Sequence, residues 1–179
     1  MTTAKEGTLD WFLDEVASKN IQTMIDSDLH YLTFGIMGPV IELLGSLYDD
    51  EPFEEADMSS QRFYKAICEI QSLKKYRRRQ HHLYNSMRSS MAHIGRPGAG
   101  VVLAQRSDAT EDQHLKKLCF RGTKRVVLVC EDLHKDIVDA VFYVRADCSK
   151  KKDLGVPFMN PNLSPDTPPV PTPTPRTSG

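Results

Sequence analysis

The sequence predicts a mainly α-helical fold, a helical bundle of about five helices with a small antiparallel β-hairpin inserted before the last helix. Apolar residues recur every three or four positions through most of the first hundred residues, the period of amphipathic helices. After residue 100, short β-branched runs replace that period and favour strands. Eight of the eleven prolines follow Val156, in a segment rich in Thr and Ser. We therefore expect one domain over residues 1–150 and a disordered tail with polyproline II bias over 151–179.

The first two predicted helices cover residues 9–25 and 29–48. The second has the wider apolar face, which predicts a central and heavily buried position. Pro39 is expected to kink this helix or to make it restart after Gly38, because proline lacks the backbone N–H that a helix interior uses.

Three signals organise the middle of the chain. The acidic residues 49–55 indicate a surface loop, and Ser59 or Ser60 is a candidate N-cap for the third helix. Gly95 and Pro97 end a fourth helix that follows a basic run. The apolar side chains expected on the third helix are Phe63, Ile67 and Ile70.

Residues 114–120 and 125–130 predict two strands joined by a turn at 121–123, after a short apolar run at 101–103. Asp132 is a plausible N-cap for the last helix. The residues expected on the buried face of that helix are Leu133, Ile137, Ala140, Val141 and Val144.

Composition limits the classes of function. With 23 basic and 24 acidic side chains the net charge is −1, so any attraction to nucleic acid must be local. The longest charge-free apolar stretch, residues 29–41, is too short to cross a bilayer, and no secretory signal is expected. Scattered cysteines and the adjacent His81 and His82 give no metal-ligand pattern. We expect a cytoplasmic protein with reduced thiols and with neither metal nor cofactor.

The segment from Arg88 to His93 is the main candidate for chemistry. A guanidinium matches phosphate oxygens, and an imidazole gives or takes a proton near neutral pH. The alternative is structural: Arg88 is then an ordinary surface residue, and His93 caps the last carbonyls of its helix.

The run L-Y-N-S-M-R-S-S-M-A-H-I-G closes the mid-chain helix, and a hairpin and a helix follow it. In this it resembles the HEPN superfamily of helical domains that carry an R-x4-6-H motif. The resemblance implies a metal-independent endoribonuclease, often of defence or stress systems, with Arg88 and His93 as catalytic residues. Other members are binding or scaffolding domains. Ser89 stands where members often have Asn, Asp or His, so a non-catalytic protein-interaction or regulatory module is the alternative.

Residues five apart differ by about 140° around a helix axis, so Arg88 and His93 do not share one face of a straight helix. A two-fold homodimer would bring a second copy of each residue across the interface. In that arrangement His93 is the general acid or base and Arg88 stabilises the charge of the phosphate. The products would be a 2′,3′-cyclic phosphate and a 5′-hydroxyl.

The densest positive charge precedes this motif and is a candidate RNA-binding segment. Lys and Arg neutralise backbone phosphates, and an aromatic ring could stack on a base. The residues are Lys74, Lys75, Tyr76, Arg77, Arg78 and Arg79. Two readings stay open beside cleavage: an RNA-binding domain that does not cut, and a solvated helix face that balances the acidic loop. The P-x-x-P segments at 165–168 and 168–171 favour a spacer over a ligand for a protein partner.

Overall fold

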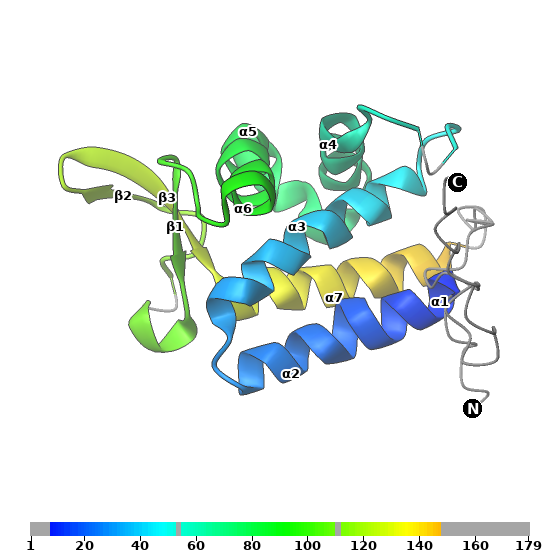
Figure 1. The fold of residues 1–179 in the computed structure, drawn as a ribbon, viewed down its shortest axis with the longest axis horizontal. Helices are drawn as coiled ribbons and strands as arrows, with labels where there is room; N and C mark the ends of the chain where they lie inside the picture. Colours follow the sequence, from blue (N-terminus) through cyan, green and yellow to red (C-terminus); the bar gives the residue numbers. More distant parts are fainter. Residues whose placement is uncertain (1–7, 53–54, 110–111, 148–179) are drawn as a thin grey trace, which may run out of the picture.

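A computed structural model describes residues 8–52, 55–109 and 112–147 (Figure 1). The predicted tail, 151–179, lies outside these residues. The N-terminal helix consists of α1 (Leu9–Trp11), the π-helical stretch η1 (Phe12–Asn20) and α2 (Ile21–Asp26). The helix that carries the Arg88 segment consists of α5 (Gln80–His82), the π-helical stretch η3 (Leu83–Ser89) and α6 (Ser90–Ile94); we call it helix 80–94. The other elements are α3 (His30–Ser46), α4 (Ser59–Glu69), the 3-10 helices η2 (Gln71–Arg79) and η4 (Arg106–Asp108), the strands β1 (Val101–Ala104), β2 (Lys117–Phe120) and β3 (Thr123–Val129), and α7 (Cys130–Ala146).

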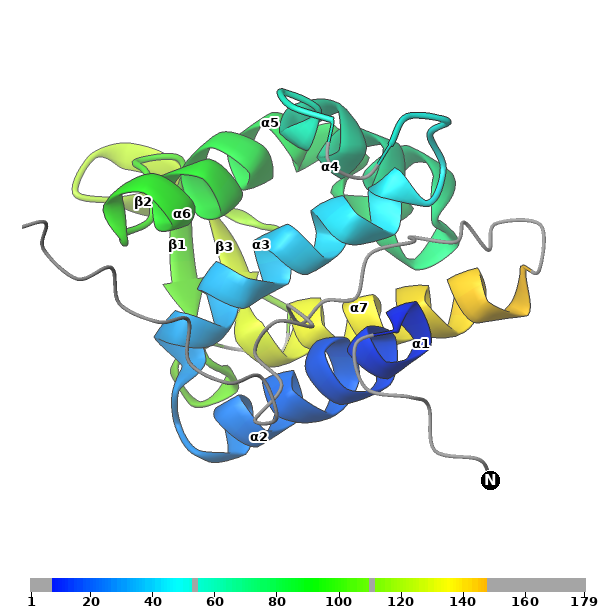
Figure 2. The same ribbon diagram turned by 45° about the vertical axis from the view of Figure 1, so that its right-hand side comes forward.

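The predicted fold class is confirmed: the described residues form a helical bundle with a small sheet. Helix α3 runs through the middle of the bundle, as its wide apolar face predicts. It packs against α4 and helix 80–94 on one side and against α7 and α2 on the other (Figures 1 and 2). The sheet lies at one end of the bundle.

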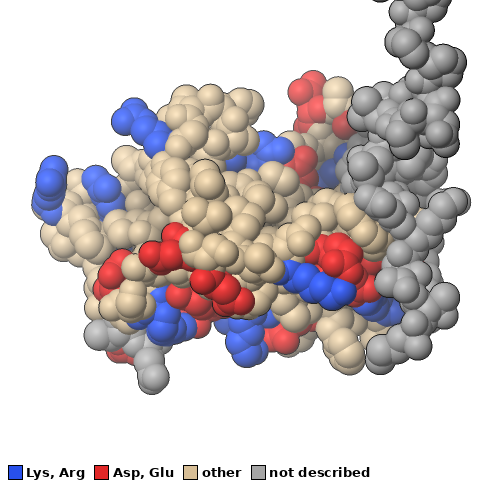
Figure 3. Space-filling view, turned by 60° about the horizontal axis from the view of Figure 1, so that its bottom comes forward, with Lys and Arg blue, Asp and Glu red and all other residues tan. Residues whose placement is uncertain are grey.

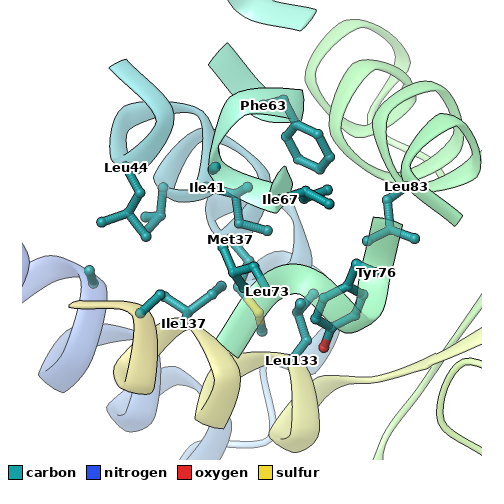
Figure 4. Packing of buried hydrophobic residues seen from close by; sticks show 14 of the residues in the cluster. Met37, Ile41, Leu44, Phe63, Ile67, Leu73, Tyr76, Leu83, Leu133 and Ile137 are labelled. Carbon is teal, nitrogen blue, oxygen red and sulfur yellow. The ribbon is translucent and has the colours of Figure 1, made fainter. Parts of the chain in front are cut away.

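The hydrophobic core lies where α3, α4, η2 and α7 meet (Figure 4). All five residues predicted for the inner face of α7 are buried, which confirms that helix and its orientation. The core side chains labelled in Figure 4 are each at most 1% exposed: Met37, Ile41, Leu44, Phe63, Ile67, Leu73, Tyr76, Leu83, Leu133 and Ile137.

The predicted hairpin is present, within a larger sheet than expected. Strands β2 and β3 pair antiparallel, and Arg121 and Gly122 form their two-residue turn with φ of 47° and 79°. Two positive φ values are the mark of a type I′ turn, whose twist matches that of the strands. The apolar run at 101–103 becomes β1, which pairs parallel with β3, so the strand order is β1-β3-β2.

Two local predictions were wrong, and one of the two alternatives given for Pro39 is excluded. Helix α3 does not restart after Gly38 but continues through Pro39. Ser59 is the first residue of α4, and its hydroxyl donates to Glu42 instead of capping the helix. The last helix begins at Cys130, so Asp132 lies in its first turn and accepts a hydrogen bond from Arg106. In each case a side chain from another segment, or packing of the whole helix, outweighs the local signal.

Within the described residues, no helix is both long and apolar enough to cross a bilayer. The same residues contain no group of three or more His, Cys, Asp or Glu side chains arranged to hold a metal ion. The cysteines are not uniformly buried: Cys130 is buried, Cys68 is half-buried and Cys119 is exposed on β2.

Candidate nucleic-acid interface

Charge is strongly segregated along the chain. Residues 71–130 contain thirteen Lys and Arg but only three Asp and Glu, whereas the rest of the sequence has ten basic and twenty-one acidic side chains. The net charge of −1 is therefore the sum of a basic segment, residues 71–130, and an acidic remainder of the chain. The α2 and α7 side of the molecule, brought forward in Figure 3, carries clusters of Asp and Glu among its cations.

The 3-10 helix η2 presents most of the predicted RNA-binding residues. With three residues per turn, Leu73 and Tyr76 fall on the same side, and both are fully buried. The ring of Tyr76 is therefore not available to stack on a base, which corrects that part of the prediction. The cations are placed outward as expected: Lys74, Lys75, Arg77 and Arg78 are exposed, and Arg79 is half-buried.

A buried polar network fixes η2 to the rest of the molecule. The Tyr76 hydroxyl donates to Asp136 of α7 and lies 2.8 Å from His114 Nε2. The backbone N–H of Val129 donates to His114 Nδ1 at 3.0 Å. Because Nδ1 accepts, the neutral imidazole carries its proton on Nε2 and donates it to the Tyr76 oxygen.

Burial sets the charge states in this network. It lowers the pKa of His114 below its usual 6.5 and raises the pKa of Tyr76 well above 10, because both charged forms lose hydration. The charge of Asp136 also raises the pKa of Tyr76. Asp136 also forms an ion pair with Lys75 Nζ at 2.7 Å. One carboxylate of α7 thus holds two neighbouring residues of η2.

The hairpin of β2 and β3 lies on the side of the molecule that carries α6 (Figure 2). Lys117 of β2 and Arg79 of η2 both lower the pKa of His82, the last residue of α5, although burial is the larger cause. The contact of Tyr76 with His114 places η2 beside the residues that lead into β2. The exposed cations of the hairpin region are Lys116, Lys117, Arg121 and Lys124.

Arg88 is held against α3. Its Nε and Nη2 atoms lie 2.6 and 2.5 Å from Glu42 Oε2. A methyl group added at Gly38 would lie 2.8 Å from Arg88 Cγ, so the arginine stem crosses α3 at a glycine. Arg88 and Glu42 line a surface pocket of about 310 Å³ between α3 and α4.

Glu42 is the functional candidate that the sequence reasoning missed. Its Oε2 also accepts a hydrogen bond from the Ser59 hydroxyl at 2.8 Å, and Tyr84 donates to Ser59 at 3.2 Å. The carboxylate thus joins three helices. One signal was present in the sequence: Glu42 is the only Asp, Glu, Lys or Arg between residues 29 and 48. A lone acid on an otherwise apolar helix usually has a cationic partner.

His93 lies apart from Arg88. It is exposed in the last turn of α6, just before Gly95 ends the helix with φ of 64°. Among the described residues, no hydrogen bond or ion pair involves its imidazole. One copy of the chain therefore presents Arg88 toward α3 and His93 toward solvent.

Comparison with known proteins gives no relative: the chain matches no protein-family model, no curated protein and no solved structure.

Proposed function

We propose that this chain binds RNA through its basic face, which we define as the exposed cations of η2 and of the hairpin region. The single observation that carries the proposal is the segregation of charge, thirteen cations against three acids in residues 71–130. The basic face consists of Lys74, Lys75, Arg77, Arg78, Lys116, Lys117, Arg121 and Lys124.

The chemistry of the face favours contact with the phosphate backbone. Lys and Arg neutralise phosphates and release condensed counterions, which gives affinity without reading bases. With Tyr76 buried, η2 exposes no aromatic ring on which a base could stack, so we expect little sequence preference from η2.

Anisotropy of a labelled single-stranded RNA, measured over a range of salt concentrations, tests the proposal. We expect log K to fall linearly with log salt, with a slope of about 0.7 per phosphate contact. The double variants Arg77→Gln/Arg78→Gln and Lys117→Gln/Lys124→Gln should each weaken binding and make the slope shallower.

A matched control removes two cations outside the basic face. Lys19 and Lys135 are 66% and 73% exposed, and each pairs with an acid one helical turn away. Their replacement by Gln should leave RNA affinity nearly unchanged. Equal effects of the control and of the two basic-face variants would contradict the proposal.

A second function, metal-independent RNA cleavage by a homodimer, is supported by the surroundings of His93. The exposed imidazole stands beside Ile94, which is 60% exposed. The first turn of α3 adds Leu32, 57% exposed, and Tyr31, whose hydroxyl donates to the Gly95 carbonyl. Pairing of two copies through these apolar side chains would bury them and put two His93 residues at one interface.

In such a dimer His93 would move the proton at the ribose 2′-hydroxyl or at the leaving 5′-oxygen, and Arg88 would stabilise the phosphate charge. Both Nε and Nη2 of Arg88 contact the Glu42 carboxylate. The Arg88 guanidinium therefore reaches a phosphate only if Glu42 shares it or releases it. The resemblance to the HEPN superfamily motivates these roles.

Cleavage is tested with structured and single-stranded RNA in excess EDTA, followed by analysis of the product ends. We expect 2′,3′-cyclic phosphates from the wild-type chain and none from His93→Ala or Arg88→Ala. Leu32→Asp/Ile94→Asp, checked by sedimentation, should lose both dimer and cutting. Equal cutting by His93→Ala, or no cutting at all, would refute cleavage at this site. The remaining functions would then be RNA binding without cleavage and an interaction module.

A further inference from the structure

The imidazole of His82 lies where three segments of the chain approach one another. It stands at the end of α5, three residues after Arg79 of η2, and its Nδ1 lies beside Gly100 of the loop that follows helix 80–94. The Gly100 carbonyl accepts the N–H of Val126 at 3.0 Å, and Val126 is the residue of β3 that pairs with Lys117 of β2. Directly paired residues share one face of a sheet, so Lys117 lies on the face that the buried Val126 side chain occupies. The ring is half-buried, and no hydrogen bond or ion pair joins it to any other residue that the structure describes.

The loop of residues 95–100 packs closely against helix 80–94 beside this ring. The Ser86 carbonyl accepts the N–H of Gly98 at 2.7 Å, and the Ser86 hydroxyl accepts the N–H of Gly100 at 3.3 Å. A Cβ at Gly100 would lie 2.9 Å from His82 Nδ1 and 2.7 Å from Ser86 Oγ. The two glycines therefore allow the backbone to approach closely, with Gly100 beside Nδ1 of the ring.

The named neighbours of His82 carry positive charge. Burial lowers the pKa of His82, and the charges of Lys117, His81 and Arg79 lower it further. His81 itself contacts Asn85, whose amide lies 3.0 Å from its Nε2. A half-buried histidine beside two cations, in no ion pair with any other residue that the structure describes, is an environment that favours an anion.

We propose that His82, Lys117 and Arg79 form a phosphate-binding subsite at the edge of the basic face. The ligand is one phosphate group, either of an RNA backbone or of a free phosphate ion. The RNA form of this proposal rests on the proposed function, whereas the free-phosphate form does not.

Binding at this subsite is coupled to a proton. A phosphate anion next to the ring favours the imidazolium, so it should raise the pKa of His82. By the same linkage, a backbone phosphate of RNA should bind more tightly as the pH falls below neutrality. A backbone phosphodiester keeps its single negative charge over this range, so the change in RNA affinity reports on the histidine.

The first measurement is an NMR titration of the histidine ring signals, with and without inorganic phosphate, in which His82→Gln assigns the His82 signal. We expect phosphate to raise the midpoint of His82 by about one pH unit. Lys117→Gln, at an exposed position, should reduce this shift without affecting the fold. His81→Gln is the matched control on the neighbouring residue and should retain it.

Two outcomes overturn the subsite. An unchanged His82 midpoint in phosphate means that no anion binds at the ring. An equal shift in the wild type and in Lys117→Gln/Arg79→Gln means an adventitious ion only.

The second measurement compares RNA affinity at about pH 7.5 and about pH 5.5 for the wild type and for His82→Gln. We expect the wild type to gain about tenfold at the lower pH and the variant to lose most of that gain. If the wild type and His82→Gln gain the same RNA affinity at the lower pH, the RNA form of the subsite is refuted. The proposal that RNA binds to the basic face is not affected by that result. A phosphate shift in a chain that binds no RNA supports the free-phosphate form and refutes the proposed function.

Discussion

Glu42 and Arg88 join the central helix α3 to helix 80–94 through a single carboxylate oxygen. Oε2 of Glu42 lies 2.6 Å from Arg88 Nε and 2.5 Å from Arg88 Nη2, and the two side chains are 20% and 17% exposed. Such a pair is intermediate between a surface ion pair and a fully buried one. Arg88, which the sequence predicts to stabilise the charge of a phosphate, is thus already paired with Glu42.

The strength of this pair can be measured with a double-mutant cycle. We expect Glu42→Gln and Arg88→Met each to lower the free energy of unfolding, because each leaves a half-buried partner unpaired. The coupling energy should be about 1–2 kcal/mol by urea denaturation. Strictly additive effects of the two substitutions would show that the pair contributes nothing.

Tyr76→Phe tests the anchor of the basic face. The substitution removes the hydroxyl that donates to Asp136 and accepts from His114, so two buried groups lose a partner. We expect a loss of about 1–3 kcal/mol in the free energy of unfolding. Tyr31→Phe is the control, since its hydroxyl donates to Gly95 at the surface. A loss no larger than that of the control would contradict the anchoring role.

Stability should fall on mild acidification. Burial lowers the pKa of His114 and of His134 below 6.5, so below that pH the unfolded chain binds protons that the native chain does not. Their contribution is fully present above about pH 6.5 and is lost as the pH falls toward the lowered native pKa values. Urea denaturation at several pH values measures the slope.

Substitution identifies the histidines responsible for that slope. His114→Gln and His134→Gln should each make stability less dependent on pH, even where His114→Gln costs stability at neutral pH. His93→Gln replaces an exposed ring and is the control. An unchanged slope in both buried variants would show that other groups cause the acid sensitivity.

Gly38→Ala tests the close approach of Arg88 to α3. The added methyl would lie 2.8 Å from Arg88 Cγ and 3.1 Å from its Cα, whereas at Gly35 the nearest atom is Met91 Cε at 3.8 Å. We expect Gly38→Ala to lose about 1–2 kcal/mol. Gly35→Ala, on the same helix, should gain up to about 1 kcal/mol from helix propensity. Similar melting temperatures for the two variants would contradict the close contact between Arg88 and Gly38.

Local patterns were sufficient for most of the fold. The apolar period placed the helices and made α3 central, Gly95 marked the end of helix 80–94, and the turn at 121–123 located the hairpin. These features depend on residues within one or two turns of each other, so a single sequence contains the information. The Arg88 and His93 roles remain predictions; in one copy of the chain Arg88 is paired with Glu42 and His93 is exposed.

Contacts between distant segments needed the tertiary structure. Glu42 meets Arg88 across 46 residues, and Tyr76 meets Asp136 across 60. The basic run was expected to expose Tyr76, but η2 winds with three residues per turn and turns that ring inward.

The sequence by itself thus determined the helices, the hairpin and the presence of a basic segment. Only the tertiary structure decided that Arg88 is paired, that Tyr76 is an anchor and that His82 lies beside the loop and the strand pair that lead to Lys117. The physical reason is range: periodicity reports which face of a segment is apolar, whereas the partner of a charge depends on where two helices cross.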